Sequence, residues 1–273
     1  MKDSLMKISN VMSKRNRILL RELVVTDFKL RYQGSVLGYA WSLLKPLLLF
    51  IILYIVFVYF LRIGRDVPHF PVYLLLGIVL WNFFVEMTSQ SLGSIVGRGD
   101  LIRKIRIPRW IIVFSSSISA IINLCFSLVV VAVFMVLNHV DPMATLLLLP
   151  VNIITIYVFA LGISLFLAAA YVKYRDVSYI WEVILQAGFY ATPIIYPLSI
   201  VQVEFIQKLL SLNPMTQAIQ AARYNAVTHT TLTAEHLLGG SFYYLIPFVV
   251  VIVVFFGGLF YFRKQSKNFA ENI

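Results

Sequence analysis

Six long runs of hydrophobic residues, separated by short polar segments, dominate the chain. None alternates with the period of two that marks a membrane β-strand, and each reaches the ~20 residues that a helix needs to cross a ~30 Å hydrocarbon core. Only helices and closed barrels satisfy every backbone group in lipid, so the pattern predicts an all-α polytopic membrane protein with six transmembrane helices. The runs are Val36–Leu61, Phe70–Val96, Trp110–Leu137, Met143–Tyr171, Val177–Tyr196 and Phe242–Phe262.

The composition agrees with a chain that lies mostly inside a membrane. Hydrophobic residues make up 60% of it and charged residues 13%, against roughly 45–50% and about 25% in a soluble domain. So few charges cannot cover a soluble globule of this size, and a disordered chain would be poor in apolar residues. The one cysteine, Cys125, cannot form an intrachain disulfide, and we expect it to pack inside the third run.

Basic residues gather on one side of the six runs. The net charge is +11, and nineteen of the 23 Lys and Arg residues lie before the first run or at its start, after the second and fourth, or after the sixth. The positive-inside rule then predicts a multi-pass protein of the cytoplasmic membrane with both termini in the cytoplasm. Because the charge encodes orientation, we expect no nucleic-acid partner. The four basic residues on the outer side are Arg62, Arg65, Lys208 and Arg223.

Residues 1–35 form a predicted cytoplasmic interface segment, and residues 36–273 a single transmembrane domain. Within Lys14–Tyr32, apolar residues fall mostly on one side of a helix, and basic residues such as Arg17 and Arg21 lie elsewhere. This pattern predicts an amphipathic helix in the inner membrane interface. Two interpretations stay open: the helix only anchors the chain, or its exposed face also docks a cytoplasmic protein. The apolar residues are Ile18, Leu19, Leu23, Phe28 and Leu30.

The loop Gly97–Arg109 also predicts a short helix. Asp100 can cap its N-terminus, and Pro108 would end it before the third run. Three apolar residues lie among the basic ones, namely Leu101, Ile102 and Ile105. A plain topology signal needs the charges but not this apolar patch, so the pattern favours a docking helix.

Between the fifth and sixth runs lie two amphipathic pieces that are too short and too polar to cross a membrane. One covers about Ile200–Leu212, and the other begins at Asn213 with Pro214 at its first helical position and continues to Val227. They predict either a short re-entrant helical hairpin in the outer leaflet or a cap on the outer face.

Four charged residues are candidates for a gate or for polar contacts between helices: Glu86, Arg175, Asp176 and Glu182. Acids inside spans are costly and often functional. Glu86 and Glu182 lie toward the inner interface, whereas a proton relay needs acids near the middle of the membrane. We therefore favour an interhelical hydrogen bond or gate contact, and for the loop with Arg175 a solvated segment is an equal alternative.

Aromatic residues make up 15% of the chain. Aromatic faces stack on sugar rings, so some of them can line a path for a sugar polymer, and lipid-facing packing is the alternative for each. The candidates are Tyr54, Phe57, Tyr59, Phe60, Tyr190 and Tyr196.

Several catalytic motifs are missing from the sequence. The dipeptide Gly-Lys does not occur, so the chain has no P-loop for ATP. Neither H-E-x-x-H nor G-x-S-x-G is present, and Glu235 and His236 are adjacent rather than one helical turn apart. We therefore expect no catalytic residue, no metal and no cofactor on this chain.

Taken in order, the motifs resemble the ABC-2-type permease subunit of bacterial polysaccharide exporters over nearly the whole chain. The most specific block is R-E-L-V-V-T-D-F-K-L-R-Y-Q-G-S-V-L-G-Y-A-W-S-L-L-K-P-L at Arg21–Leu47. The others are R-G-D-L-I-R-K-I-R-I-P-R at Arg98–Arg109, Y-R-D-V at Tyr174–Val177, T-P-I-I-Y at Thr192–Tyr196 and L-N-P-M at Leu212–Met215.

This resemblance implies a homodimer that pairs with two copies of a cytoplasmic ATP-binding subunit, which binds ATP and Mg. The interface helix and the loop after the second run would contact that ATPase, the loop as a coupling helix over Asp100–Ile107. The residues implied in coupling are Arg17, Arg21, Asp100, Leu101, Ile102, Arg103, Lys104, Ile105 and Arg106.

The resemblance also implies that the substrate is a lipid-linked glycan taken from the inner leaflet of a bacterial cytoplasmic membrane, where the chain contacts membrane lipids. O-antigen, teichoic acid and rhamnose-rich wall glycans are not distinguished. The hairpin, about Pro197–Val227, would lie at the channel exit. Two alternatives remain: a proton-coupled secondary carrier, which calls for mid-membrane acids, and a membrane-embedded glycosyltransferase, which calls for clustered acids with phosphate ligands.

Overall fold

The computed structural model describes residues 14–32, 35, 37–62, 64, 66–104, 107–239 and 242–269, and all regular structure within them is helical. The longer elements are α2 (Lys14–Tyr32), α3 (Trp41–Tyr54) continued by the π-helix η2 (Ile55–Phe60), α4 (Phe70–Ser94), α5 (Gly99–Lys104), α6 (Trp110–Leu137), α7 (Leu149–Lys173), α8 (Val177–Ala191), α9 (Glu204–Ser211), α10 (Pro214–Ala226), α11 (Ala234–Leu238) and α12 (Ile246–Gln265). The short 3-10 helices are η1 (Gly38–Ala40), η3 (Val96–Arg98), η4 (Ala144–Leu148), η5 (Leu198–Ile200), η6 (Phe242–Leu245) and η7 (Ser266–Asn268).

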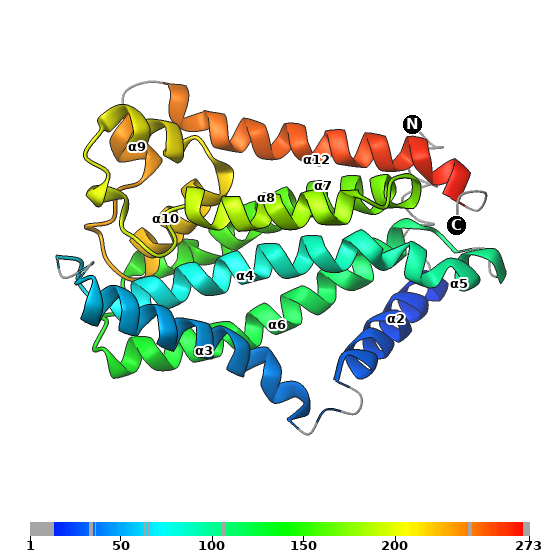
Figure 1. Ribbon diagram of the computed structural model, residues 1–273, viewed down its shortest axis with the longest axis horizontal. Coiled ribbons are helices and arrows are strands. Elements are labelled where there is room, and N and C mark those ends of the chain that lie inside the picture. The colour runs from blue at the N-terminus through cyan, green and yellow to red at the C-terminus, as the bar shows by residue number, and fades with distance from the viewer. Residues whose placement is uncertain are drawn as a thin grey trace.

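The long helices run side by side in one bundle (Figure 1). α9 and α10 lie at one end of the bundle, and α2 and α5 lie at the other. Five helical segments in the described part of the chain are long and apolar enough to cross a membrane. They are Leu43–Phe60, Phe70–Ser94, Trp110–Leu137, Ala144–Lys173 and Phe242–Gln265. The fold is thus an all-helical membrane bundle, as the hydrophobic pattern predicts.

The fifth predicted run is shorter as a helix than the pattern suggests. α8 ends at Ala191 because Pro193 follows, and a proline disfavours helical backbone in the residue before it. Thr192 accordingly has extended backbone, with φ −95° and ψ 132°. At ~1.5 Å per residue, α8 is roughly 22 Å long, so the count of six spans stays a prediction.

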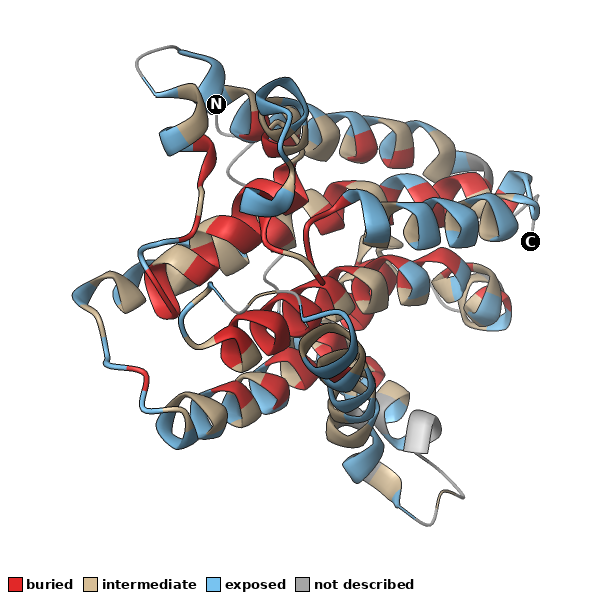
Figure 2. Cartoon of the chain, turned by 60° about the vertical axis from the view of Figure 1, so that its left-hand side comes forward, coloured by how far each residue is buried: buried red, intermediate tan, exposed pale blue. Residues whose placement is uncertain are grey.

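α4 forms the centre of the bundle. It contacts α3, α6, α7, α8 and α10, and it is buried along most of its length. Buried residues accordingly gather in the middle of the molecule (Figure 2). α4 is also the least apolar of the five candidate spans. This ordering is physically reasonable, because a helix that faces lipid must be apolar, whereas one enclosed by protein can carry polar groups.

Small polar side chains join neighbouring helices to α4. Trp181 Nε1 of α8 donates to Thr88 Oγ1 at 3.2 Å, and Ser164 Oγ of α7 donates to the Met87 carbonyl at 3.2 Å. The hydroxyls of Ser91 and Ser116 lie 3.1 Å apart across the contact between α4 and α6. In lipid such interhelical hydrogen bonds, rather than the hydrophobic effect, select the neighbours of a helix.

α7 and α12 pack backbone to backbone through two glycines. A Cβ on Gly162 would lie 2.6 Å from the Phe255 Cα, and a Cβ on Gly258 would overlap the Gly162 carbonyl oxygen. Small residues allow helices in a membrane to approach this closely. By contrast, Cys125, which we expected to pack inside the third run, is exposed on α6, so that expectation is wrong.

The two amphipathic pieces between the fifth and sixth runs form helices α9 and α10. Asn213 caps α10, since its Oδ1 accepts from the Met215 amide at 3.0 Å, and Pro214 occupies the first turn. α9 is largely exposed, whereas α10 is buried against α4 and α7. Whether the pair enters the outer leaflet stays a prediction.

Candidate functional site

The residues predicted to couple to an ATPase lie at the end of the bundle that carries α2 and α5 (Figure 1). On α2, Arg17 and Arg21 are exposed. On α5, Lys104 is exposed, and Leu101 and Ile102 are half-buried. The side chain of Arg103 and the whole of Ile105 and Arg106 lie outside the described residues.

Asp100 does not cap this helix from outside, as the sequence suggested. α5 begins at Gly99, and the exposed Asp100 lies within its first turn. The interpretation as an N-cap is therefore wrong by two positions, because Asp100 is the second residue of the helix. The carboxylate still lies at the positive end of the helix dipole, where a negative charge is favourable.

An ion pair fastens α2 to the start of this loop. Arg98 Nη2 pairs with Asp27 Oδ1, and Arg98 Nη1 donates to Ser115 Oγ at 2.9 Å. Ser115 Oγ in turn lies 3.4 Å from Asp27 Oδ2. Three elements, α2, η3 and α6, thus meet at one half-buried charge cluster, which we call the Asp27–Arg98 clamp.

A second arginine anchors the other end of the loop. Arg109 Nη1 donates to the Ser266 carbonyl, and its Cζ lies 5.9 Å from the centre of the Phe269 ring. The loop that carries α5 is therefore attached at both ends. Its start is bound to the interface helix α2, and its end is bound to the segment after α12.

The clamp is a feature that sequence analysis missed. In the sequence, Arg98 and Arg109 stand out as charges that set orientation and as the ends of a family motif, and nothing there pairs Arg98 with Asp27. The available signal was an acid on a helix that otherwise carries mostly basic charge.

Glu86 lies beside a polar pocket between α3, α4 and α6. It accepts from Gln90 Nε2 at 2.6 Å and from Asn123 Nδ2 of α6. The cavity has a volume of about 490 Å³. Its aromatic and polar wall includes Trp41, Lys45, Asn82, Ser89 and Ser127.

One acceptor in this pocket is unused by the described residues. Asn123 is 5% exposed, and its Oδ1 has no hydrogen-bond partner among them. The carboxylate of Glu86 fixes the amide with its NH₂ group toward α4, so the carbonyl oxygen can accept from a hydroxyl group or water.

The other candidates for gate or interhelical contacts are exposed. Arg175 and Asp176 lie in the turn between α7 and α8, where the Arg175 Cζ lies 5.1 Å from the Tyr171 ring centre. Glu182 lies on the exposed face of α8 and makes no hydrogen bond to another described side chain. Glu86 therefore accepts a hydrogen bond from a neighbouring helix, whereas Glu182 is exposed.

The aromatic candidates fall into two groups on separate helices. Tyr54 and Phe57 are half-buried, and Tyr59 and Phe60 are exposed, at the C-terminal end of the first span. Tyr190 is exposed at the end of α8, and its carbonyl accepts from the half-buried Tyr196 hydroxyl at 3.1 Å. No ring contact joins the two groups among the described side chains.

At the opposite end of the bundle, Arg223 of α10 is completely buried. Its Nε donates to the Tyr73 carbonyl at 3.0 Å, and its Nη1 and Nη2 donate to the carbonyls of Pro193 and Ile194, each at 2.6 Å. Gln220 Oε1 accepts from Nη1 at 3.0 Å. We call these five residues the Arg223 cluster.

Gly77 makes room for this guanidinium. A Cβ at position 77 would overlap Nη2 of Arg223. The cluster joins α4, α10 and the T-P-I-I-Y segment that follows α8. Sequence analysis counted Arg223 only as an outer charge, although it is the single charged residue of α10.

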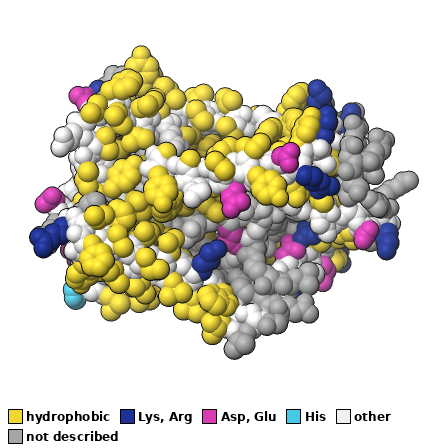
Figure 3. All heavy atoms as spheres, viewed as in Figure 1, with side chains coloured by type: hydrophobic (Ala, Val, Ile, Leu, Met, Phe, Trp, Pro, Cys, Tyr) yellow, Lys and Arg dark blue, Asp and Glu magenta, His cyan; other side chains and the backbone are white. Residues whose placement is uncertain are grey.

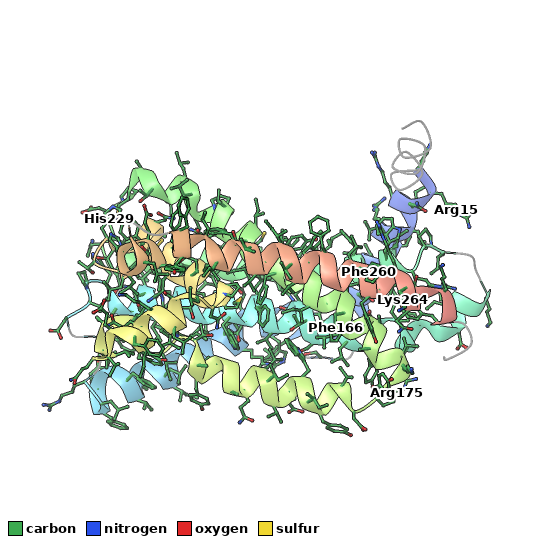
Figure 4. The ribbon with its side chains drawn as sticks, turned by 90° about the horizontal axis from the view of Figure 1, so that it is seen from above. Arg15, Phe166, Arg175, His229, Phe260 and Lys264 are labelled. Atoms are coloured by element: carbon green, nitrogen blue, oxygen red, sulfur yellow. The ribbon has the colours of Figure 1, made fainter. Side chains whose placement is uncertain are left out.

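Three basic residues and one histidine mark the two ends of the bundle. Arg15, Arg175 and Lys264 lie toward one end, and His229 lies at the other (Figure 4). Hydrophobic side chains cover most of the face shown in Figure 3, and most basic side chains in that view lie toward its right-hand end. Among the described residues there is no group of three or more His, Cys, Asp and Glu side chains that could hold a metal ion.

Comparison with known proteins identifies the family to which this chain belongs. Residues 18–227 match the family described as ABC-2 type transporter. The chain is 31% identical over 223 residues to the O-antigen export system permease protein RfbA of Myxococcus xanthus, covering 81% of this chain and 85% of that one. It is 27% identical to a protein of the same name from Klebsiella pneumoniae, covering 80% and 83%.

A more distant relative is the polysialic acid transport protein KpsM of Escherichia coli, which is 21% identical and covers 76% of this chain and 80% of its own length. The family match includes α2 from Ile18 onward, the Asp27–Arg98 clamp, α5, the Glu86 pocket and the Arg223 cluster. The chain therefore belongs to the ABC-2 type transporter family.

Proposed function

We propose that this chain is the permease subunit of an ATP-driven exporter that moves a lipid-linked polysaccharide across the bacterial cytoplasmic membrane. Family membership carries this proposal, and the names of the relatives favour a polysaccharide as the cargo. The sequence lacks a P-loop. ATP and Mg would accordingly be bound by a separate subunit, and this chain is not an enzyme by itself.

The proposed topology has six spans, with α8 as the fifth and both termini in the cytoplasm. α2 and the end of α12 lie at the same end of the bundle (Figure 1), which favours an even number of crossings. The turn with Arg175 lies at that end too, and α9 and α10 lie at the far end. Both observations support α8 as a crossing helix, and the basic residues support a cytoplasmic position for the α2 end.

Coupling would run through α2 and α5. Two copies of the ATP-binding subunit would close on ATP and push on the exposed residues of both helices. Because the Asp27–Arg98 clamp and Arg109 fasten this region to α6 and to the segment after α12, the push would move those spans together. The result would be a shift of population between inward-open and outward-open states.

The exposed face of α8 is an argument for a second copy of the chain in the complex. Glu182 and Gln186 are exposed on it, alongside Tyr179, Val183 and Tyr190. A carboxylate and an amide facing lipid are costly, so this face is better placed against protein or along a wet path. We propose a homodimer whose glycan path runs beside α8, with the exposed aromatic rings offering stacking surfaces.

The test uses the chain with and without the ATP-binding subunit. We expect the purified chain to hydrolyse no ATP, and the complex to hydrolyse ATP and move lipid-linked polysaccharide into inverted vesicles. The control complex carries a Walker-A Lys→Ala variant of the partner, which should bind the chain but move nothing. Transport by the chain without a partner would overturn the proposal.

A proton-coupled carrier would behave differently. In the proposed exporter, Glu86→Gln should retain export within a few-fold, because glutamine can also hydrogen-bond Gln90 and Asn123. Collapse of the proton gradient should not stop transport while ATP is present. Transport that stops on collapse, and is also abolished by Glu86→Gln but not by the exposed control Asp141→Asn, would instead favour the carrier.

A further inference from the structure

A groove with a basic rim lies between α6, α7 and α12, at the end of the bundle that carries the loop anchors. Its volume is about 770 Å³. Its wall is aromatic and aliphatic, formed by Trp110, Phe114, Leu165, Phe255, Leu259 and Phe262. The described side chains that line it include two cations, Arg109 and Arg263, and no carboxylate.

Both arginines can bind a further group. Arg263 is exposed in the last turn of α12. Arg109 uses Nη1 for the Ser266 carbonyl, and a guanidinium has five N–H donors in total. The pair therefore forms a positive site beside an apolar wall, at the depth where basic and aromatic residues meet a membrane surface.

The groove lies beside an exposed apolar surface of α12, which suits the interior of a bilayer. α12 exposes Ile252, Val253, Phe256 and Phe260 along the same stretch that supplies Phe255 and Leu259 to the groove. Acyl chains would thus continue from the bilayer into the groove.

We propose that this groove binds an anionic phospholipid of the bilayer. The two guanidiniums would hold its phosphate, and the aromatic wall would hold its acyl chains. Basic pockets between transmembrane helices on the cytoplasmic side commonly bind anionic head groups. A zwitterionic lipid presents a cationic group beside its phosphate, which the two arginines repel, so the site selects for net negative charge. The inference does not depend on which cargo is exported.

The position also links this lipid to the coupling region. Arg109 ends the loop that carries α5, and its contact with Ser266 forms one side of the groove. A phosphate that holds Arg109 and Arg263 together would strengthen the attachment of the loop to the segment after α12. An anionic bilayer would therefore stabilise the anchored form of the loop.

The test measures lipid retention by native mass spectrometry of the detergent-purified chain, titrated with phosphatidylglycerol or phosphatidylcholine. We expect phosphatidylglycerol to be retained preferentially, and Arg263→Gln to weaken its retention about fivefold, since each basic side chain near a phosphate contributes roughly that factor. Lys264→Gln removes the same charge one residue away, outside the groove, and should change retention by less than twofold.

A second variant tests the apolar wall. Leu259→Trp fills the groove without changing its charge, so it should reduce retention of phosphatidylglycerol while leaving the melting temperature of the lipid-free chain within a few degrees. Equal retention of both lipids by the parent chain would overturn the proposal. So would equal effects of Arg263→Gln and Lys264→Gln, or binding of an isoprenoid phosphate in place of phosphatidylglycerol.

Discussion

The guanidinium of Arg223 lies 3.8 Å from the centre of the Tyr73 ring and donates to the carbonyl of the same residue. The two residues are 150 positions apart in the chain. This contact holds α10 against α4, and the carbonyls of Pro193 and Ile194 bring the segment after α8 to the same point. Three parts of this end of the bundle are thereby fixed by one side chain.

Arg223→Lys should destabilise the protein despite keeping the charge. An ammonium is a compact point charge and cannot reproduce the planar fork that reaches three carbonyls. Disrupting a buried, hydrogen-bonded charge network costs about 3 kcal/mol or more. Thermal unfolding in detergent measures the loss, with Lys208→Met on α9 as the control. The Lys208 pair with Glu204 is largely exposed, so that control should unfold near the parental temperature.

Gly77→Ala should lower the stability of the protein by a similar amount, because Gly77 on α4 faces the same guanidinium. The new methyl group would displace the guanidinium of Arg223. Gly93→Ala is a matched control on the same helix, because a Cβ there meets nothing within 4 Å. It should be neutral or stabilising by up to about 1 kcal/mol. If the cluster explains the effect, Gly77→Ala will cost much less in an Arg223→Met background, whereas additive costs would contradict it.

The helical class and the extent of most spans were predictable from hydrophobic run length, because lipid imposes that pattern directly. Burial was not predictable in this way. α4 is the most enclosed span and the least apolar one, so hydropathy alone ranks it lowest although it forms the core. The end of α8 was also missed, since Pro193 interrupts the helix without interrupting the apolar run.

The candidate site likewise has one part that the local sequence pattern predicts and another that it does not. Exposed basic residues of α2 and α5 were visible as a charged, amphipathic pattern near the chain start and after the second run. The Asp27–Arg98 clamp and the Arg223 cluster join residues 71 and 150 positions apart, respectively. No local periodicity reports such contacts. The available signals were an acid on the mostly basic α2 and the single charged residue of α10, since such charges often need a partner.

The glycine pair between α7 and α12 gives a prediction with a neighbouring control. Gly258→Ala places a methyl group on the Gly162 carbonyl oxygen and should separate the two helices. Gly257→Ala points into open space and should leave stability unchanged or slightly raised. Unfolding temperatures of the two variants, measured in the same detergent, compare them directly. Similar losses for both would show that the cost arises from helix propensity rather than from the close contact.

The Asp27–Arg98 clamp should matter more for coupling than for folding. It is half-buried, with side-chain exposures of 22% and 18%, so Asp27→Asn should cost only about 1–2 kcal/mol of stability. Without the clamp, α2 still packs against α6 but is no longer tied to the start of the loop that carries α5. We therefore expect the Asp27→Asn complex to hydrolyse ATP at a near-parental rate but to move several-fold less polysaccharide per ATP.

Three further variants assign that effect to the ion pair. Glu22→Gln removes an exposed carboxylate from the same helix and should leave the ratio of transport to hydrolysis unchanged. Arg98→Asp should lower the ratio as Asp27→Asn does. Combining Arg98→Asp with Asp27→Arg restores opposite charges in exchanged positions and should recover part of the lost transport. If hydrolysis and transport fall together in Asp27→Asn, the residue supports assembly with the ATP-binding subunit, and the clamp is not the element that transmits its motion.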